Sequence, residues 1–402
     1  MGGGLLQLVA YGAQDVYLTG NPQITFFKVV YRRHTNFAIE AIQQTFNGNP
    51  GYGNRVTCQI SRNGDLIHRM YLAVDMSAET EEVCPYFGLR LVDYVELEIG
   101  GQKIDKQYSH WMYVWNELSL PVSKRDGYKK MVGGDGGVLS ATTNDQLYIP
   151  LEFWFCRNVG LALPLIALQY HEVKVNILFQ TADKCKSTAD ALGDLGATSL
   201  WVDYIFLDTD ERRRFAQLSH EYLIEQLQFT GTESISGTQA KPKLSFNHPC
   251  KELYWFTTWT IGADQDNNNN WFNFTTTAAN AEPWYAARSA VNTVNPIGSA
   301  KLVLNGNDRF AERPGSYFNL VQPYQHHENV PGNPGINVYS FALKPEEHQP
   351  SGTLNMSRID TAVLNLNGLV LPDPANTLLH VYAVNYNVLR ILSGMGGLAY
   401  SN

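Results

Sequence analysis

The chain has 402 residues, enough for two or three domains at the usual size of about 100–200 residues each. Hydrophobic residues make up 44% of the chain, charged residues only 17%, and the net charge is −8. The acidic balance argues against a protein whose main task is gripping nucleic acid. The low charge content indicates that much of the surface is covered by something other than solvent.

Strand patterns dominate the first half of the chain. The segments alternate or run apolar over strand length, and Gly, Asn, Pro or Asp punctuate them. They are 55–61, 66–76, 91–101, 146–155, 168–179 and 199–208. The main helical stretch is "SHWMYVWNELSL" (109–120), followed by a shorter one at 123–132.

A second set of strand patterns follows Arg214. Its members are 222–231, 242–247, 251–262, 300–306, 337–343, 358–368 and 378–392. Many short strands with turns between them favour a sandwich or barrel over a parallel α/β sheet.

The two sets look like copies of each other. Three segments of the first set match three of the second in the same order, which indicates an internal duplication. The matches are "LEIGGQ" with "LVLNGN", "LQYHEVKV" with "IDTAVLNL", and "LWVDYIFLD" with "LHVYAVNYN".

The segment 263–299 is a long loop rich in Asn, Thr and Ala. Loops of this length inside a compact domain are usually functional or disordered. Its aromatic residues favour a folded excursion with a small core of its own. We expect it on the surface, where its deletion would leave assembly intact.

No catalytic constellation stands out. "HEYLIE" at His220 begins like a zinc-protease motif, but Ile224 replaces the second histidine and the pattern is that of a strand. "QHHE" at His326 and His327 could bind a metal, but the flanking prolines favour a solvated loop. A GxxxxGK[ST] phosphate loop is missing from the sequence.

The cysteines and the amino terminus indicate the cell compartment in which the protein is made. The five cysteines are far apart and form no CxxC pair, which argues against a disulfide framework or a structural zinc site. The start of the chain lacks the layout of a secretory signal. The longest apolar run, 159–168, is too short for a spanning helix of about 20 residues. We expect a soluble protein made in the cytosol with reduced thiols.

Two basic segments could contact acidic partners. Arg212, Arg213 and Arg214 follow three acidic residues, so local pairing is the simpler interpretation. The segment 26–33 interleaves basic and aromatic residues, as single-stranded nucleic-acid sites do. The overall acidity makes that interpretation weak.

Ordered blocks along nearly the whole chain resemble one protein family. They include "GAQDVYLTGNPQITFFKVVYRRHTNFAIE", "VELEIGGQKID", "PLIALQYHEVKV", "HEYLIEQLQF" and "NYNVLRILSGMGGLAY". They resemble the major capsid protein of large icosahedral double-stranded DNA viruses, and look closest to that of viruses of chlorella-like algae (phycodnaviruses).

The resemblance implies an all-β fold of two tandem eight-stranded jelly rolls, with short helices in loops. It implies a structural protein without catalysis, assembled as a homotrimer with a pseudo-hexagonal outline that tiles an icosahedral shell. Neighbouring capsomers and minor capsid proteins are the implied partners, with an internal membrane beneath the shell. The implied location is the outer capsid shell of the virion, assembled in host cytoplasm, with no direct nucleic-acid binding.

Residues 1–26 are expected to form an amino-terminal arm, 27–213 the first jelly roll and 214–402 the second. The duplicated copy has no counterpart of the arm, so we expect the arm to dock on partners beneath the shell. We also expect the chain from Phe27 onward to lead into the first strand, with its aromatic residues as anchors. The arm's candidate contact residues are Asp15, Tyr17, Asn21, Pro22 and Phe26.

The resemblance implies no cofactor but possible N-linked glycans, at unusual sequence contexts. Ordinary sequons begin at Asn273 and Asn355. The glycosylation candidates are Asn273, Asn292 and Asn376. The short segment after Leu366 leaves room for a specialised paralogue of the main shell protein.

Two alternatives remain open. Jelly rolls also build lectins, and Trp271, Trp284 and Tyr285 in the long loop could form a carbohydrate-binding surface. A cupin-type enzyme would need clustered histidine and carboxylate ligands on inner strands. The ten histidines do not cluster in this way.

Overall fold

The computed structural model describes residues 3–139, 146–259, 268–276 and 295–400. The chain divides into two units, Met1–Asn36 and Phe37–Asn402. The first unit contains two short helices, α1 (Gly3–Val9) and α2 (Val16–Thr19). Every strand in the described residues belongs to the second unit.

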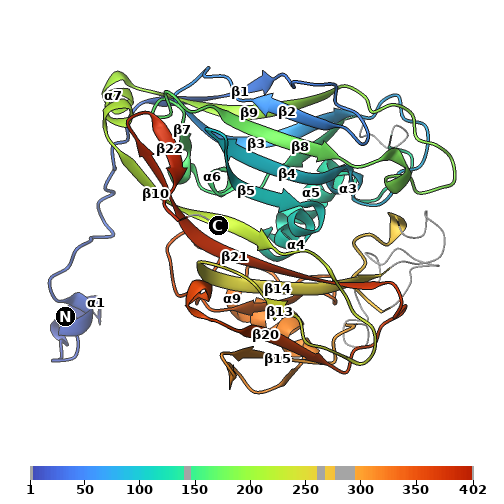
Figure 1. The fold of residues 1–402 in the computed structure, drawn as a ribbon. Helices are drawn as coiled ribbons and strands as arrows, with labels where there is room; N and C mark the ends of the chain where they lie inside the picture. The colour runs from blue at the N-terminus through green and yellow to red at the C-terminus, as the bar shows by residue number, and fades with distance from the viewer. Residues whose placement is uncertain (1–2, 140–145, 260–267, 277–294, 401–402) are drawn as a thin grey trace. The chain divides into compact units, whose positions relative to one another are not determined.

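The first sandwich consists of two antiparallel sheets (Figure 1). One has the strand order β1-β9-β3-β6 and the other β2-β8-β4-β5. Their bounds are β1 (Phe37–Gln44), β2 (Arg55–Gln59), β3 (Leu66–Asp75), β4 (Val92–Ile99), β5 (Gln102–Tyr108), β6 (Gln146–Pro150), β8 (Val173–Phe179) and β9 (Thr198–Leu207).

The second sandwich repeats this order strand for strand. Its sheets have the orders β10-β21-β14-β18 and β12-β20-β15-β16, and β13 also pairs with β20. The bounds are β10 (His220–Phe229), β12 (Gln239–Ala240), β13 (Lys243–Leu244), β14 (Pro249–Trp259), β15 (Ser299–Leu304), β16 (Asn307–Asp308), β18 (Asn337–Ser340), β20 (Ala362–Asn367) and β21 (Thr377–Leu392). The expected tandem double jelly roll is confirmed, and so is the internal duplication.

Short strands extend these sheets. They are β7 (Leu163–Pro164), β11 (Glu233–Ser234), β17 (Arg313–Pro314), β19 (Leu354–Asn355) and β22 (Met395–Leu398). Of these, β17 pairs with β15 at Ser299 and Ala300, so β16 and β17 together continue one interrupted strand.

One hairpin turn shows the duplication at the level of single dihedral angles. Between β4 and β5, Gly100 and Gly101 have φ values of 58° and 83°. Between β15 and β16, Asn305 and Gly306 have φ values of 48° and 80°. Two consecutive positive φ angles define the tight hairpin turn that only Gly and Asn adopt readily. This requirement explains the shared Gly in "LEIGGQ" and "LVLNGN".

Helices fill the connections. They are α3 (Phe87–Leu91), α4 (Ser109–Ser119), α5 (Val122–Met131), α6 (Trp154–Arg157), α7 (Thr209–Gln217) and α9 (Gln322–His326), preceded by the π-helical turn η4 (Tyr317–Val321). Single 3-10 turns lie at η2 (Val159–Leu161), η3 (Ala182–Lys184) and η5 (Met356–Arg358). None of the described helices has both the length and the apolar character that spanning a bilayer requires.

Several predicted boundaries differ from the structure. The predicted strand 146–155 ends at Pro150, and Trp154 and Phe155 belong to α6 instead. Helix α7, which was not predicted, contains the expected domain boundary between residues 213 and 214. The acidic first turn and basic last turn of α7 suit the helix dipole.

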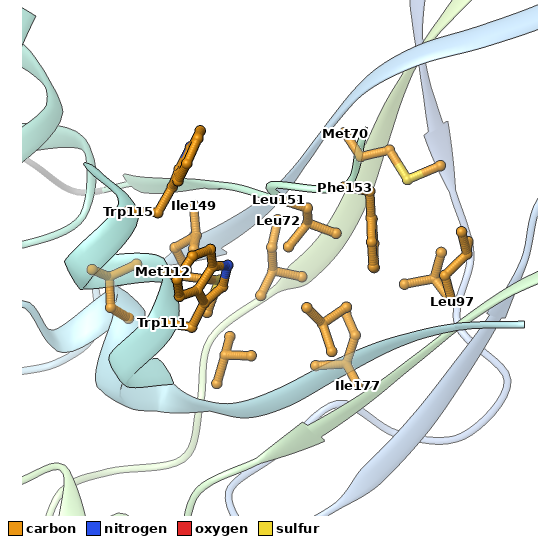
Figure 2. Close-up of a cluster of buried hydrophobic side chains, with 14 of the residues drawn as sticks. Met70, Leu72, Leu97, Trp111, Met112, Trp115, Ile149, Leu151, Phe153 and Ile177 are labelled. Carbon is orange, nitrogen blue, oxygen red and sulfur yellow. The ribbon is translucent and has the colours of Figure 1, made fainter. Parts of the chain in front are cut away.

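The core of the first sandwich lies between its two sheets. Figure 2 shows Met70 and Leu72 of β3, Leu97 of β4 and Ile177 of β8 directed into one cluster. Trp111 of α4 lies in the same cluster (Figure 2). The cluster also includes Tyr254, Phe256 and Tyr382 of the second sandwich.

The sheet β10-β21-β14-β18 is buried on both faces. Leu253 and Trp255 of β14 belong to the core of the second sandwich, whereas Tyr254 and Phe256 face the first sandwich. A strand buried on both sides loses its alternation of apolar and polar residues. This explains the nearly continuous apolar run "ELYWFTTW" in β14.

Candidate functional site: the packed face between the two sandwiches

Helix α4 connects the two sandwiches. All of its residues from Ser109 to Leu118 are buried, and it lies between β5 and β21 (Figure 1). The Trp111 ring packs edge-on against Tyr254 at 4.9 Å and lies 6.0 Å from Tyr382. A helix that is buried all round needs apolar partners on every side. The first sandwich supplies these partners on one side of α4, and the sheet of the second sandwich supplies them on another.

Aromatic rings continue this contact beyond α4. His110 stacks on Trp271 at 4.3 Å, and Phe256 stacks on Phe274 at 4.0 Å. Burial lowers the pKa of His110 well below its usual value, and burial lowers that of His380 to about 3. Both imidazoles are therefore neutral and act here as flat aromatic rings.

A buried ion cluster crosses the same face. Lys251 of β14 is fully buried, and its Nζ lies 2.7 Å from Oε1 of Glu225 on β10. Arg157 of α6, in the first sandwich, lies 3.0 Å from the other oxygen of Glu225 and 3.8 Å from the Trp115 ring centroid. One carboxylate thus serves two cations from different sandwiches. Breaking such a buried cluster on one side leaves uncompensated charge.

A second buried group lies next to this cluster. Nε2 of His327 lies 3.0 Å from Oε1 of Glu252, and Nδ1 lies 2.7 Å from Oε1 of Glu346. Tyr254 donates a hydrogen bond to the second oxygen of Glu252. Burial alone would lower the pKa of His327, but the charges of Glu252 and Glu346 and their hydrogen bonds outweigh it and raise the pKa to about 9.

The solvated-loop interpretation of "QHHE" is therefore wrong for His327, whose side chain is completely buried. The His326 side chain has a different partner and contacts the carbonyl oxygen of Leu343. Across the described ranges, no group of three His, Cys, Asp or Glu side chains is placed to hold a metal ion.

The protonated His327 predicts a pH dependence of stability. Its folded-state pKa lies above the unfolded value near 6.5. The stabilisation is therefore complete below about pH 6.5 and is lost as pH rises through about 9. The free energy of unfolding of the parent protein should fall by a few kcal/mol between about pH 6 and pH 9.5, and His327→Gln should abolish this fall. Urea unfolding at fixed protein concentration measures it. Equal pH slopes in the two proteins would contradict a charged His327.

Hydrogen bonds between side chains and the backbone fix the register of the contact. Asp105 of β5 accepts a hydrogen bond from the Leu227 backbone N–H at 3.0 Å, and Gln226 donates to the carbonyl oxygen of Ile104. Burial raises the pKa of Asp105, although the hydrogen bonds from Leu227 and Gln107 oppose that effect. The edge strand of the first sandwich is thus bound to the edge strand of the second.

In the described residues, the corresponding face of the first sandwich is covered by Phe215 of α7 and Ala162 only where Leu66 and Ile205 lie, and the rest is partly exposed. On the outer side of sheet β1-β9-β3-β6, Tyr71 stacks parallel to Trp201 at 6.4 Å and meets Tyr148 edge-on at 5.9 Å. Phe37 and Ile39 of β1 add exposed apolar surface on the same face. We call the outer side of this sheet the open face. An exposed apolar patch of this kind marks an interaction surface.

The glycosylation candidates fall in three different environments. Asn273 is only 1% exposed, and its side chain accepts hydrogen bonds from the backbone and hydroxyl of Thr275, so its burial weighs against a glycan. Asn292 lies outside the described residues. Asn376 is exposed, and its side chain donates to Asp373. Asn355, which begins the other sequon, is exposed and caps η5.

The arm residues are mostly exposed. Tyr17, Asn21, Pro22 and Phe26 are exposed, and Asp15 is partly buried, accepting a hydrogen bond from the Gly12 backbone. Residues 3–36 carry further exposed apolar side chains: Leu5, Leu6, Leu8, Val9, Tyr11, Val16, Leu18, Ile24, Phe27, Val29, Val30 and Tyr31.

The entry into the first strand lies later than expected. The first strand begins at Phe37, whereas the expected arm ended at residue 26. Phe27 and Tyr31, expected to anchor the chain, are exposed instead.

The arginine run at the junction pairs in two ways. Arg214 pairs with Glu211 within α7, as local pairing predicts. Arg212 instead binds both oxygens of Asp65 in the first sandwich, at 3.0 Å each. The sequence offers no signal for this second pair, because its partners are far apart along the chain.

The long loop is not simply a surface excursion. Phe272 and Phe274 are buried in the core shared by the sandwiches, so the expectation of a separate small core is wrong for residues 268–276. Trp271 stacks on His110, and the Arg90 guanidinium lies 3.5 Å from its ring centroid. A stacked and half-buried Trp271 gives no support to a sugar-binding surface. Trp284 and Tyr285 lie outside the described residues.

Comparisons with known proteins agree with this architecture. Residues 25–208 match the family described as "Major capsid protein N-terminus", and residues 211–397 match "Large eukaryotic DNA virus major capsid protein". The two matches meet at the start of α7.

Two relatives align over the full length of both chains. The chain is 54% identical to the major capsid protein of Pyramimonas orientalis virus and 48% identical to that of Paramecium bursaria Chlorella virus 1. A chain of the quasi-atomic PBCV-1 virus capsid superposes with a TM-score of 0.78 at 41% identity. The superposition covers 94% of this chain and 100% of that one.

Two jelly rolls of one topology, joined through a covered sheet face, define a double jelly-roll capsid protein. The chain belongs to the family of major capsid proteins of large eukaryotic DNA viruses. It is a structural protein of the capsid shell and not an enzyme.

Proposed function

We propose that this protein assembles as a homotrimer with a pseudo-hexagonal outline, and that these capsomers tile the outer shell of an icosahedral virion. The supporting observation is the contact between the two sandwiches: copies of one topology meet through unlike surfaces, α4 on one and a sheet face on the other. Such a head-to-tail contact builds closed rings when its rotation closes. Three chains supply six sandwiches for one ring.

Residues 1–36 are proposed as the arm, followed by one jelly roll on each side of α7. The arm's exposed apolar side chains support docking on other proteins, since an isolated soluble chain rarely leaves so many uncovered. The proposed partners are minor capsid proteins beneath the shell, above an internal membrane, with assembly in host cytoplasm.

Native mass spectrometry of the purified protein and of a variant lacking residues 1–36 tests this proposal. Each should show three times the mass of its own chain, which is 45.1 kDa for the full chain and less for the truncated one, because the sandwiches carry the trimer contact. On co-expression, only the full chain should retain the minor capsid proteins. A monomeric full chain would refute the trimer, and retention by the truncated chain would refute the docking arm.

Asn376 is the described glycosylation candidate with an accessible side chain, and we propose it as an N-linked site. The intact mass of virus-derived protein should exceed the sequence mass. The excess should fall when Asn376 is replaced by Gln. An unchanged mass in that variant would rule out this site.

A further inference from the structure

The duplication places a counterpart of α4 in the second sandwich. In the first sandwich, α4 directly follows β5 and precedes β6. In the second, η4 and α9 (residues 317–326) follow the interrupted strand β16/β17 and precede β18. We call this counterpart the η4–α9 segment. It occupies the same place in the topology as the helix that covers the next sandwich.

One side of the η4–α9 segment is fixed to its own sandwich. Phe318 is buried, with its ring 5.1 Å from Trp255. Gln322 accepts a hydrogen bond from the Ser340 backbone of β18 and donates one to the hydroxyl of Tyr317. The Phe318 ring and the Gln322–Ser340 hydrogen bond thus hold the segment against its own sandwich.

The other side is apolar and uncovered. Tyr324 is 80% exposed, Val321 is 38% exposed and Leu343 is 73% exposed. The contact between His326 and the Leu343 carbonyl oxygen holds Leu343 next to the end of α9. Val321 and Tyr324 belong to the segment that takes the place of α4 in the strand order, and Leu343 lies beside it.

The surface that this side would meet is the open face. In the match of "LWVDYIFLD" with "LHVYAVNYN", Trp201 stands at the position of His380 and Asp203 at that of Tyr382. His380 and Tyr382 lie on the sheet face that the first sandwich covers. The open face is thus the same face of the duplicated sheet, covered by α7 only at Leu66 and Ile205.

We infer that the exposed side of the η4–α9 segment in one copy docks on the open face of a neighbouring copy. This inference rests on the proposed trimer and names the surfaces that form it. Each copy offers one helix and one sheet face, so the contact is heterologous and repeats the contact within the chain. Six equivalent steps, three within chains and three between them, close the ring.

Three matched tyrosine substitutions test the inference. Tyr324→Asp changes the helix side, and Tyr148→Asp changes the open face, where Tyr148 is 39% exposed. Tyr170→Asp is the control, since Tyr170 is 75% exposed but lies outside both surfaces. Native mass spectrometry should show trimers for the parent and the control. It should show loss of the trimer, to a folded 45.1 kDa monomer, for the other two.

The outcomes separate this inference from the proposed function. A parent protein that is not trimeric overturns both. A trimeric parent with trimeric Tyr324→Asp and Tyr148→Asp variants overturns the docking surfaces alone. Circular dichroism checks that the variants are folded. A Tyr324→Cys/Tyr148→Cys double variant should form covalent trimers on mild oxidation, because the inference places these two positions on facing surfaces of neighbouring copies. The native cysteines other than Cys156 are buried and should not interfere. Absence of these cross-links contradicts the inference.

Discussion

Replacing Trp111 by Ala is expected to lower the free energy of unfolding by about 3–5 kcal/mol. Trp111 is 1% exposed and contacts rings of the second sandwich through Tyr254 and Tyr382. Its removal leaves a cavity at the point where the two sandwiches meet, and the surrounding sheet cannot collapse into it freely. The variant should therefore have a weaker contact between the sandwiches as well as a lower stability.

Urea unfolding at fixed protein concentration measures this loss. Tyr170→Ala serves as the control, because it truncates an exposed aromatic side chain and should cost less than about 1 kcal/mol. A loss as small in Trp111→Ala as in the control would show that α4 does not hold the sandwiches together.

Replacing Glu225 by Gln is expected to cost about 3–5 kcal/mol. The substitution keeps the shape of the side chain but removes the charge that Lys251 and Arg157 share. Lys251 is fully buried, so water cannot replace the lost carboxylate. The effect should be large even though the change is nearly isosteric.

The same strand offers a matched control. Glu221 of β10 pairs with Arg390, but both side chains are more than half exposed. Glu221→Gln should therefore change stability by no more than about 1 kcal/mol. Similar midpoints for the two variants in chemical denaturation would contradict the importance of the buried cluster.

The strand positions and the duplication could be predicted because they rest on local signals. The paired Gly and Asn turns and the alternating strands follow from backbone sterics within a few residues. The double burial of β14 also left a local signal in its continuous apolar run, which indicates a strand covered on both faces.

The polar contacts between the sandwiches could not be predicted in this way. His327 lies between prolines in a segment without apolar periodicity. Its partners Glu252 and Glu346 are far from it along the sequence. Its burial follows from tertiary packing alone. Asn273 matched a sequon but turned inward for the same reason, since its neighbours Phe272 and Phe274 enter the shared core.

The composition also has a structural explanation. Aromatic residues make up 12% of the chain, and many lie on the face between the sandwiches, where large rings cover much area with little loss of side-chain entropy. The open face is a second aromatic surface, which we propose contacts another copy. The scarcity of charge fits a subunit whose faces are covered by its own kind.

An electron cryomicroscopy map of the purified capsomer tests the central claim most directly. The account predicts a three-fold particle with six sandwiches in a ring, in which the η4–α9 segment covers the sheet β1-β9-β3-β6 of the adjacent chain. A particle in which this sheet faces solvent, or in which copies meet through like surfaces about a two-fold axis, would contradict it.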